Sequence, residues 1–367
     1  MDHIKVLKRA WETTWRYRAL WIFGIILALT TASGGGSGGG GGGGNGSNGG
    51  NGGLRPPGDF PFPPHRFAWP EILSQAVSIL IVVGIGVACV IVLLSIAAVV
   101  ARYVAETALI RMVDDHEETG EKRSVREGFR MGWSRTALRL FLIKLLISLP
   151  LAIAFILLFA LAFAPLLLWA TESRVAGVIG TVATVGLFFL ILFLLIIVAT
   201  VVSVLIRFFW RACALEELGV IESIQQGFDV VRRHLKDVVI MWLIMVGVRI
   251  AYAIALIASV VVLFPLIILL IVVGGVLGGL PALVIGGLAS LFLEGPVPWI
   301  LAGIVGIPVF ILVVAVPWVF LGGLMEVFKS STWTLTYREL RALEGLETEI
   351  ETTAAEEWSE LDKPGPD

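Results

Sequence analysis

The sequence predicts an all-α protein, a polytopic transmembrane helix bundle with about six spans. We expect the spans to form three helical hairpins, each preceded by a cytoplasmic amphipathic helix. The 367-residue chain is 57% hydrophobic and only 15% charged, which lies outside the range of soluble globular proteins. Several apolar stretches reach the roughly 20 residues that a helix needs to cross a bilayer. In addition, one short motif occurs before two of these stretches.

The repeated motif reads Gly-x-x-x-Ser-apolar-x-Glu/Gln-Gly-Phe and occupies residues 120–129 and 219–228. The N-terminal segment fits the same frame more loosely, with Ala10-Trp11 in place of Gly-Phe. Without the glycine-rich insert at 34–53, this third copy would have nearly the same spacing. A repeat at fixed spacing indicates architecture first. It therefore predicts three successive units, each with an amphipathic helix, an outward span and an inward span.

Each unit should begin with a helix that lies at the membrane interface. On the first, over residues 3–18, one face carries Ile4, Leu7, Trp11 and Trp15. The second and third have apolar stripes at Val125, Phe129, Trp133, Thr136 and Leu140, and at Ile224, Phe228, Val231 and Leu235. Aromatic rings at headgroup depth are typical of interfacial helices. We therefore predict interfacial anchors at Trp11, Trp15, Phe129, Trp133 and Phe228.

Local signals predict where the second and third amphipathic helices begin. Ser124 with Glu127, and Ser223 with Gln226, have the spacing of a capping box. Gly120 and Gly219 lie four residues upstream, where the preceding helix can end in a left-handed turn.

The expected spans cover residues 19–33, 75–100, 138–170, 175–206, 238–270 and 299–325. The first would be only about 22 Å long as a helix, so the bilayer would thin locally or flanking side chains would extend to the interface. A cleaved signal peptide ending near Thr30-Thr31-Ala32 is an alternative for this segment.

The stretch 238–293 is too long for one span and contains Pro265, Pro281 and several glycine pairs. We expect one span broken near Pro265, followed by a broken or re-entrant segment. The glycines at 274–287, like Gly84 and Gly86, are interpreted as close helix-packing positions, because no phosphate-loop sequence accompanies them.

These segments divide the chain into four parts. Residues 1–33 hold the first amphipathic helix and span, and 34–70 form a Gly/Asn-rich and then Pro/aromatic external loop. The transmembrane bundle covers 71–345. An acidic disordered tail is expected over 346–367.

Lys and Arg predict the orientation of the spans. The formal net charge is only −2, but 22 of the 27 basic residues lie in segments 1–18, 101–139, 207–237 and 326–367. Basic residues are retained on the cytoplasmic side. Both termini should therefore be cytoplasmic, in a multi-pass protein of a bacterial plasma membrane.

Arg249 is the main candidate for a functional side chain, because it lies well inside an apolar stretch. A charge at that depth costs about 2.5–3.5 kcal/mol on insertion scales. With Tyr252 it forms a candidate anion or lipid contact, and Glu294 is a speculative partner. The alternative is an arginine that faces the bundle and bonds to carbonyls and to Tyr252.

Other polar groups predict little chemistry. Lys144 should extend to the interface, and the acidic run 114–118 should be a solvated turn between two helices. The four histidines are scattered, and the sequence contains no familiar hydrolase, metalloprotease or nucleotide-binding motif. We expect no enzyme activity, catalytic residues, cofactor or metal site. The expected partners are membrane lipids and, as a second class, other membrane proteins, but not nucleic acid.

The motif helices and the segment Trp333-Thr-Leu-Thr-Tyr337-Arg-Glu-Leu-Arg341 together resemble a group of uncharacterised bacterial multi-pass proteins. That group includes the membrane domain attached to some glycerophosphodiester phosphodiesterases, whose catalytic domain has no counterpart here. The resemblance implies a fold and a location, without a substrate.

The sequence thus favours an integral membrane protein without catalytic activity, acting in membrane organisation, lipid contact or as an accessory subunit. The alternative is a transporter or permease, with a pathway near Arg249 and the broken 265–298 segment.

Overall fold

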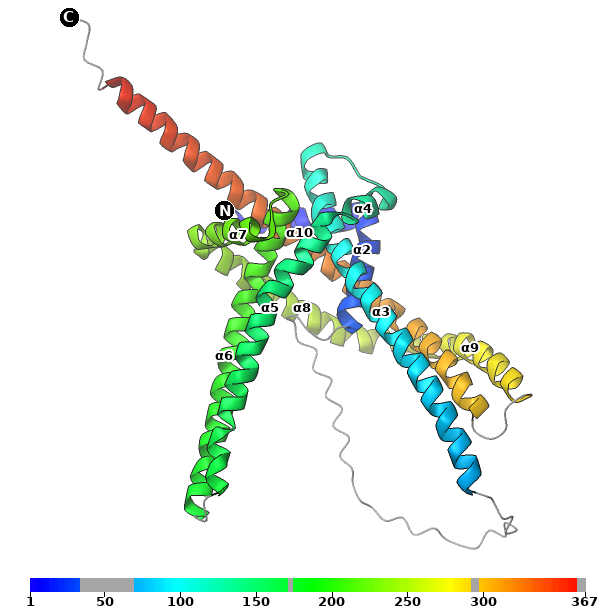
Figure 1. Ribbon diagram of the computed structural model, residues 1–367. Helices are drawn as coiled ribbons and strands as arrows, with labels where there is room; N and C mark the ends of the chain where they lie inside the picture. Colours follow the sequence, from blue (N-terminus) through cyan, green and yellow to red (C-terminus); the bar gives the residue numbers. More distant parts are fainter. Residues whose placement is uncertain (34–68, 171–173, 292–296, 362–367) are drawn as a thin grey trace, which may run out of the picture. The chain divides into compact units, whose positions relative to one another are not determined.

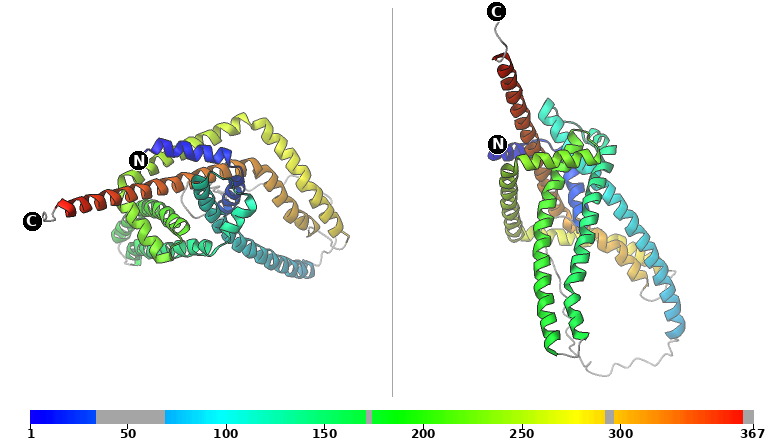
Figure 2. Two further views of the ribbon diagram at one scale, coloured as in Figure 1. Left: turned by 90° about the horizontal axis from the view of Figure 1, so that it is seen from above. Right: turned by 60° about the vertical axis from the view of Figure 1, so that its left-hand side comes forward.

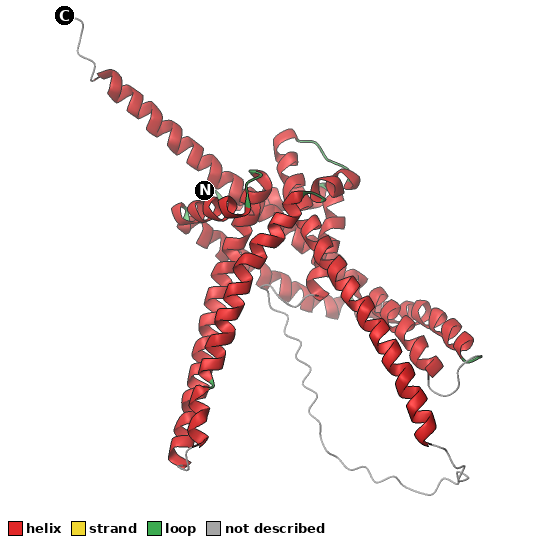
Figure 3. Cartoon of the chain, in the orientation of Figure 1, coloured by secondary structure: helices red, strands yellow, loops and turns green. Residues whose placement is uncertain are grey.

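The computed structural model describes residues 1–33, 69–170, 174–291 and 297–361, which form helices joined by short turns, without a strand among them (Figures 1 and 3). The elements are α1 (His3–Arg16), α2 (Ala19–Ser33), α3 (Trp69–Thr119), α4 (Val125–Gly132), α5 (Arg135–Ala162), the 3-10 helix η1 (Ala164–Ala170), α6 (Arg174–Leu215), α7 (Val220–Arg233), α8 (Leu235–Val262), α9 (Phe264–Ala289) and α10 (Val297–Leu361). The predicted all-α fold is confirmed.

The chain divides into two compact units, and α3 belongs to both. One unit is Ser37–Val100, whose described part is the first portion of α3. The other comprises Met1–Gly36 and Ala101–Asp367. All contacts reported below lie within this larger unit.

The three repeated units are visible as three pairs of helices. In each pair a short amphipathic helix (α1, α4 or α7) is followed by a longer apolar helix (α2, α5 or α8). The breaks between them fall at Tyr17–Arg18, Trp133–Ser134 and His234, and the N–H of each first residue still bonds back to its own helix. The stripes that we expected to run on to Leu140 and Leu235 are therefore divided between two helices.

The start of α4 agrees with its sequence signal. Ser124 is the N-cap, the Glu127 carboxylate accepts the Ser124 N–H at 2.8 Å, and the Ser124 hydroxyl oxygen accepts the Glu127 N–H at 3.4 Å. Gly120, with φ of 72°, ends the preceding helix in a left-handed turn.

The start of α7 differs from the prediction. The helix begins one turn earlier, because Glu222 accepts the Gly219 N–H at 3.0 Å. Ser223 instead donates to the Gly219 carbonyl oxygen at 2.6 Å, so the predicted box of Ser223 and Gln226 is wrong. Gly219 has φ of −65°, and the left-handed residue before this helix is Glu217, with φ of 52°.

Six helical segments in the described residues are long and apolar enough to span a membrane. They are Gly84–Thr119, Arg135–Leu168, Arg174–Leu215, Leu235–Val262, Phe264–Ala289 and Val297–Leu346. The number agrees with the prediction, but the set differs. The apolar part of α2, Ala19–Thr31, is shorter than these six, and α9 is among them.

The broken or re-entrant segment predicted after Pro265 is instead the continuous helix α9. The chain does break near Pro265, at Leu263, but α9 then continues through Pro281 to Ala289. Every fourth residue on one face of α9 is small, and this face packs along α10 (Figure 2). A Cβ at Gly278 would lie 2.7 Å from the Gly306 carbonyl oxygen, so this approach needs glycine.

The interpretation of the glycines as packing positions therefore holds for one residue of each pair, namely Gly274, Gly278 and Gly286. A Cβ at Gly84 or Gly86 would meet no atom within 4 Å, so this interpretation has no support at those two positions.

The short helix α2 packs against α10. A Cβ added at Gly323 would lie 2.8 Å from the backbone nitrogen of Ile25, and Gly24 faces Gly323 in return. Leu20, Phe23 and Leu27 of α2 are buried.

The C-terminal region also differs from the expected disordered tail. α10 continues to Leu361, through most of residues 346–367. Glutamate, alanine and leucine, which are strong helix formers, are frequent there and extend the helix. The glycine-rich tract, the loop up to residue 68 and the last six residues lie outside the described residues.

Buried side chains gather at the ends of the spans where the three amphipathic helices also lie. One core cluster joins Val6 and Ala10 of α1 to Phe208 of α6, Met241 of α8 and Trp333 of α10. Two further clusters are built from α2, the end of α3, the start of α5 and the end of α6. The apolar middle stretches of the spans are mostly exposed, as expected for surfaces that contact lipid.

Candidate functional site

The first amphipathic helix buries small side chains and exposes aromatic ones. Val6 and Ala10 of α1 are fully buried, whereas Trp11 is 56% exposed and Trp15 is also exposed. The rings of the two tryptophans contact each other edge to face, with 5.7 Å between their centroids. Exposed cations accompany them on the same helix: Lys5, Lys8, Arg9 and Arg16. Aromatic rings beside cations are the features of a helix that lies on an anionic membrane.

The other two amphipathic helices repeat this arrangement. In α4, Gly128 and Gly132 are buried, Phe129 is exposed, and Trp133 at its end is 73% exposed. In α7, Gly227 and Val230 are buried and Phe228 is exposed. Exposed arginines lie on both helices: Arg126, Arg130, Arg232 and Arg233. All five predicted anchors thus lie on exposed surface, which is the position that an interfacial role requires.

The glycine that directly precedes phenylalanine in the repeated motif has a packing role. A Cβ at Gly227 would lie 2.6 Å from the Phe209 ring of α6, and one at Gly128 would collide with Met112 and Phe23. The buried Ala10 occupies the equivalent place in α1. The motif therefore combines a small residue that faces the protein with an aromatic residue that faces outward.

A group of charged side chains lies near the ends of the spans. We call it the cation cluster: Glu106, Arg207, Arg211, Arg249, Glu326 and Lys329. Arg211 is its most buried member, with 2% of its side chain exposed. Its guanidinium donates to the carbonyl oxygens of Arg207 at 2.7 Å and Ser330 at 3.2 Å. It also lies 4.0 Å from the Glu106 carboxylate. Arg211 thus ties α6 to α10 and α3.

Lys329 and Arg207 are two further cations of the cluster. The Lys329 ammonium contacts both Glu326 carboxylate oxygens, at 2.8 and 2.9 Å. The Arg207 guanidinium carbon lies 5.1 Å from the centre of the buried Trp333 ring, a cation–π contact. Arg207 also interacts electrostatically with Arg249, Glu326 and Glu106.

The candidate pair from the sequence, Arg249 and Tyr252, lies in the region of the cation cluster. Arg249 interacts electrostatically with Arg207 and Lys329, and Tyr252 with Glu326. Arg207 and Lys329, which both interact with Arg249, also interact with Glu326, just past the end of the expected last span. Glu294, the partner suggested by the sequence, lies outside the described residues.

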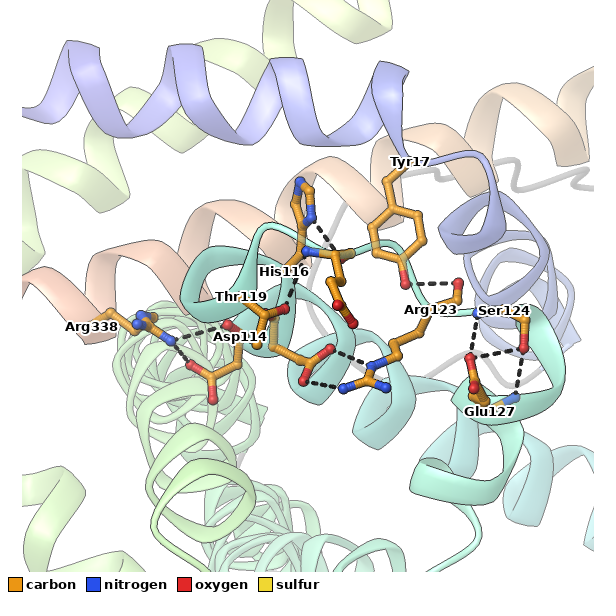
Figure 4. Close-up of polar contacts among 10 residues, drawn as sticks. Tyr17, Asp114, His116, Thr119, Arg123, Ser124, Glu127 and Arg338 are labelled. Atoms are coloured by element: carbon orange, nitrogen blue, oxygen red, sulfur yellow. Dashed lines mark hydrogen bonds and ion pairs between the residues drawn. The ribbon is translucent and has the colours of Figure 1, made fainter.

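The acidic run 114–118 is the last part of α3 and is not the expected solvated turn (Figure 4). Asp114 pairs with Arg338 of α10, and Glu117 with Arg9 of α1. Asp115 pairs with Arg123 at 2.8 Å. These ion pairs join three helices, so the run serves assembly. Among the described residues, no group of three or more metal-ligating side chains is placed to hold an ion.

The short connection before α4 is fixed to the N-terminal helices by Tyr17 (Figure 4). Its hydroxyl donates to the Arg123 carbonyl oxygen at 2.9 Å. Burial raises the pKa of Tyr17 to about 12. The Asp115 carboxylate raises the pKa of Arg123, and the Ser124 N–H lowers that of Glu127.

A surface hollow of about 350 Å³ lies beside this network. It is lined by Asp114, Glu118, Leu215, Glu216, Tyr337, Arg338 and Arg341. Glu216 accepts hydrogen bonds from the Tyr337 hydroxyl and, at 2.9 Å, from Arg341. The Tyr- and Arg-bearing segment quoted in the sequence is thus bound to the ends of α3 and α6.

Lys144 and the histidines that the structure describes lie outside the cation cluster. Lys144 is half-buried in α5 and interacts electrostatically with Arg102. His116 contacts the Glu121 carbonyl oxygen at 2.9 Å, and His3 lies 3.5 Å from Asp237.

The fold and the site thus define an all-helical membrane protein with three amphipathic helices and a cation cluster at the ends of its spans. The chain belongs to a family of unknown function, DUF7544, whose model matches residues 1–336. The match covers all three repeated units and most of the residues described above. No curated protein and no solved structure matches the chain.

Proposed function

We propose that the protein is a non-catalytic integral membrane protein that contacts anionic lipid at the cytoplasmic surface of a bacterial plasma membrane. The observation that carries this proposal is the threefold arrangement of α1, α4 and α7. Each buries small residues in the protein and exposes aromatic residues next to cations. A helix of that design gains binding energy from apolar burial and from attraction to anionic lipid.

The distribution of charge supports the cytoplasmic orientation. The three interfacial helices and the loops beside them carry most of the lysines and arginines. The cytoplasmic leaflet is negatively charged and attracts basic segments, at about 1 kcal/mol per residue near the surface. Basic residues and acidic lipid would therefore meet on the same side.

The absence of catalysis is part of the proposal. Acidic side chains at the helix ends form ion pairs with arginines, as in Asp114–Arg338 and Asp115–Arg123. Carboxylates neutralised in this way stabilise helix packing and are poor general bases. The transport alternative loses its argument from a broken 265–298 segment, because α9 is continuous to Ala289.

Spin labels test the interfacial contact. In a background without Cys89 and Cys213, a nitroxide is attached to Phe129→Cys or Phe228→Cys in the full chain, within nanodiscs containing phosphatidylglycerol. A matched label at Glu121→Cys, in the exposed turn before α4, reports a water-facing site.

We expect both anchor-site labels to be accessible to oxygen and shielded from a water-soluble nickel complex, and the Glu121 label to show the reverse. Equal accessibility to the nickel complex at all three sites would contradict the interfacial position. No inorganic phosphate should be released when the purified protein is incubated with lipid, since we propose no turnover.

A further inference from the structure

The cation cluster holds several like charges close together in a partly buried place. It contains four cations, Arg207, Arg211, Arg249 and Lys329, and two carboxylates, Glu106 and Glu326. Arg207 lies close to both Arg211 and Lys329, so cations are held near one another here. Like charges held close together in partly buried surroundings are unfavourable unless an anion accompanies them.

Both carboxylates are already engaged. Glu326 holds Lys329 through both oxygens, and Glu106 accepts a hydrogen bond from Ser330 at 3.4 Å while it lies near Arg211. Both carboxylates that interact with Arg207 therefore have nearer partners.

Arg207 has a fixed orientation and unused donors. Its guanidinium is held over the Trp333 ring, and in the described part of the chain its side chain donates no hydrogen bond. The buried Arg211 Nε and Trp333 Nε1 also have no hydrogen-bond partner there. Buried N–H donors are normally paired, so three neighbouring donor groups in this state point to an acceptor that binds among them.

The cluster lies where a lipid phosphate would lie. Arg207 directly follows the apolar stretch 175–206, and Glu326 directly follows 299–325. The first half of α8 packs in the same core cluster as Phe208 and Phe328, which brings Arg249 to this level. Arginine is favoured for phosphate, because its planar fork can donate two parallel hydrogen bonds.

We propose that the cation cluster is a binding site for a phosphate group, with Arg207 as its principal ligand. The phosphate belongs either to an anionic lipid headgroup or to free inorganic phosphate. The lipid source deepens the proposed lipid contact and rests on it, whereas the phosphate site itself does not depend on the interfacial helices.

The test uses the full chain in a neutral detergent, at constant ionic strength. Thermal unfolding is measured against inorganic phosphate in one series and against phosphatidylglycerol in mixed micelles in another, with phosphatidylcholine for comparison. A ligand that binds the folded state raises the unfolding temperature in a saturable manner. The Arg207→Gln variant is compared with Arg174→Gln, which removes the same charge from an exposed position at the start of α6, outside the three amphipathic helices.

We expect a saturable rise for the wild type and for Arg174→Gln, and an apparent Kd weakened about tenfold or more by Arg207→Gln. A response to phosphatidylglycerol alone identifies the lipid headgroup as the source. A response to inorganic phosphate alone identifies the free anion. A response to both means that the two compete for one site.

The proposal is overturned if the wild type shows no saturable rise with either ligand, or if both variants have the same Kd. Should Arg207→Gln not fold, Arg207→Lys replaces it, because it keeps the charge and loses the fork; its Kd should lie above that of the wild type. An unchanged Kd in that variant would likewise overturn the assignment. The accessibility of the spin label at Phe228 should be the same in both Arg207 variants as in the wild type. A failure of the phosphate site can therefore be distinguished from a failure of the interfacial contact.

Discussion

At the scale of single residues, the repeated motif places a buried glycine directly before an exposed phenylalanine. Gly128 and Gly227 are buried against neighbouring helices, and the phenylalanine after each is exposed. The sequence predicted the exposed aromatic residues because their spacing marks one face of a helix. It could not predict the role of the glycines, since a close approach depends on which helix lies opposite.

The cation cluster shows the same division between what was predictable and what was not. Arg249 stood out because a charge inside an apolar stretch is unusual. Arg207, Glu326 and Lys329 were missed because they flank their apolar stretches, where basic residues are common. One usable signal was present: Glu326 and Lys329 are opposite charges three residues apart on a helix.

Tyr17 gives a prediction at this scale. Replacing it with phenylalanine removes the hydrogen bond to the Arg123 carbonyl oxygen and should lower the free energy of unfolding by about 1 kcal/mol at neutral pH. Because burial raises the pKa of Tyr17 to about 12, the protonated hydroxyl is favoured in the folded state. Its contribution is complete below the unfolded value of about 10 and is lost as the pH rises through about 12.

Detergent-induced unfolding of the wild type and Tyr17→Phe, followed from about pH 8 to about pH 12, checks this. The stability difference between the two proteins should shrink across the upper part of that range. A difference that stays constant would show that the hydroxyl does not titrate as described.

At the scale of helices, the sequence predicted the amphipathic starts and most spans but not their breaks. Each amphipathic helix ends one or two residues before its apolar partner begins, at Tyr17–Arg18, Trp133–Ser134 and His234. Periodicity continues across these points, so it could not locate them. Glycine and proline suggested a broken segment after Pro265, but packing against α10 allows α9 to continue.

The α9–α10 contact makes a testable prediction with a built-in control. Gly278→Leu should separate the two helices, because its Cβ would lie 2.7 Å from the Gly306 carbonyl oxygen. The neighbouring Gly279→Leu adds the same side chain where a Cβ meets no atom within 4 Å. We expect the first variant to lose about 1–3 kcal/mol of stability, and the second to change little.

Detergent-induced unfolding of the two variants at neutral pH provides the comparison. Equal stabilities of the two variants would mean that the Gly278 face does not pack on α10, because leucine has the higher helix propensity at both positions. A loss confined to Gly279→Leu would reverse the assigned face.

At the scale of the whole molecule, the larger unit is held together near one end of its spans. Buried residues of α1, α2 and α7 meet the ends of α3 and α6 and the middle of α10, while the apolar spans are mostly exposed. Composition and charge predicted six spans and the basic ends. Which helices form the core was not predictable, because apolar residues facing lipid and those facing protein look alike in sequence.

The central claim is that the interfacial helices and the loops beside them lie on the cytoplasmic side. In the background without Cys89 and Cys213, one cysteine is placed at Glu121 and another at Ser47 of the glycine-rich tract, and intact cells are treated with a membrane-impermeant thiol reagent. Labelling of Ser47→Cys in intact cells, with Glu121→Cys reacting only after permeabilisation, is the predicted result. Labelling of Glu121→Cys in intact cells would contradict the account.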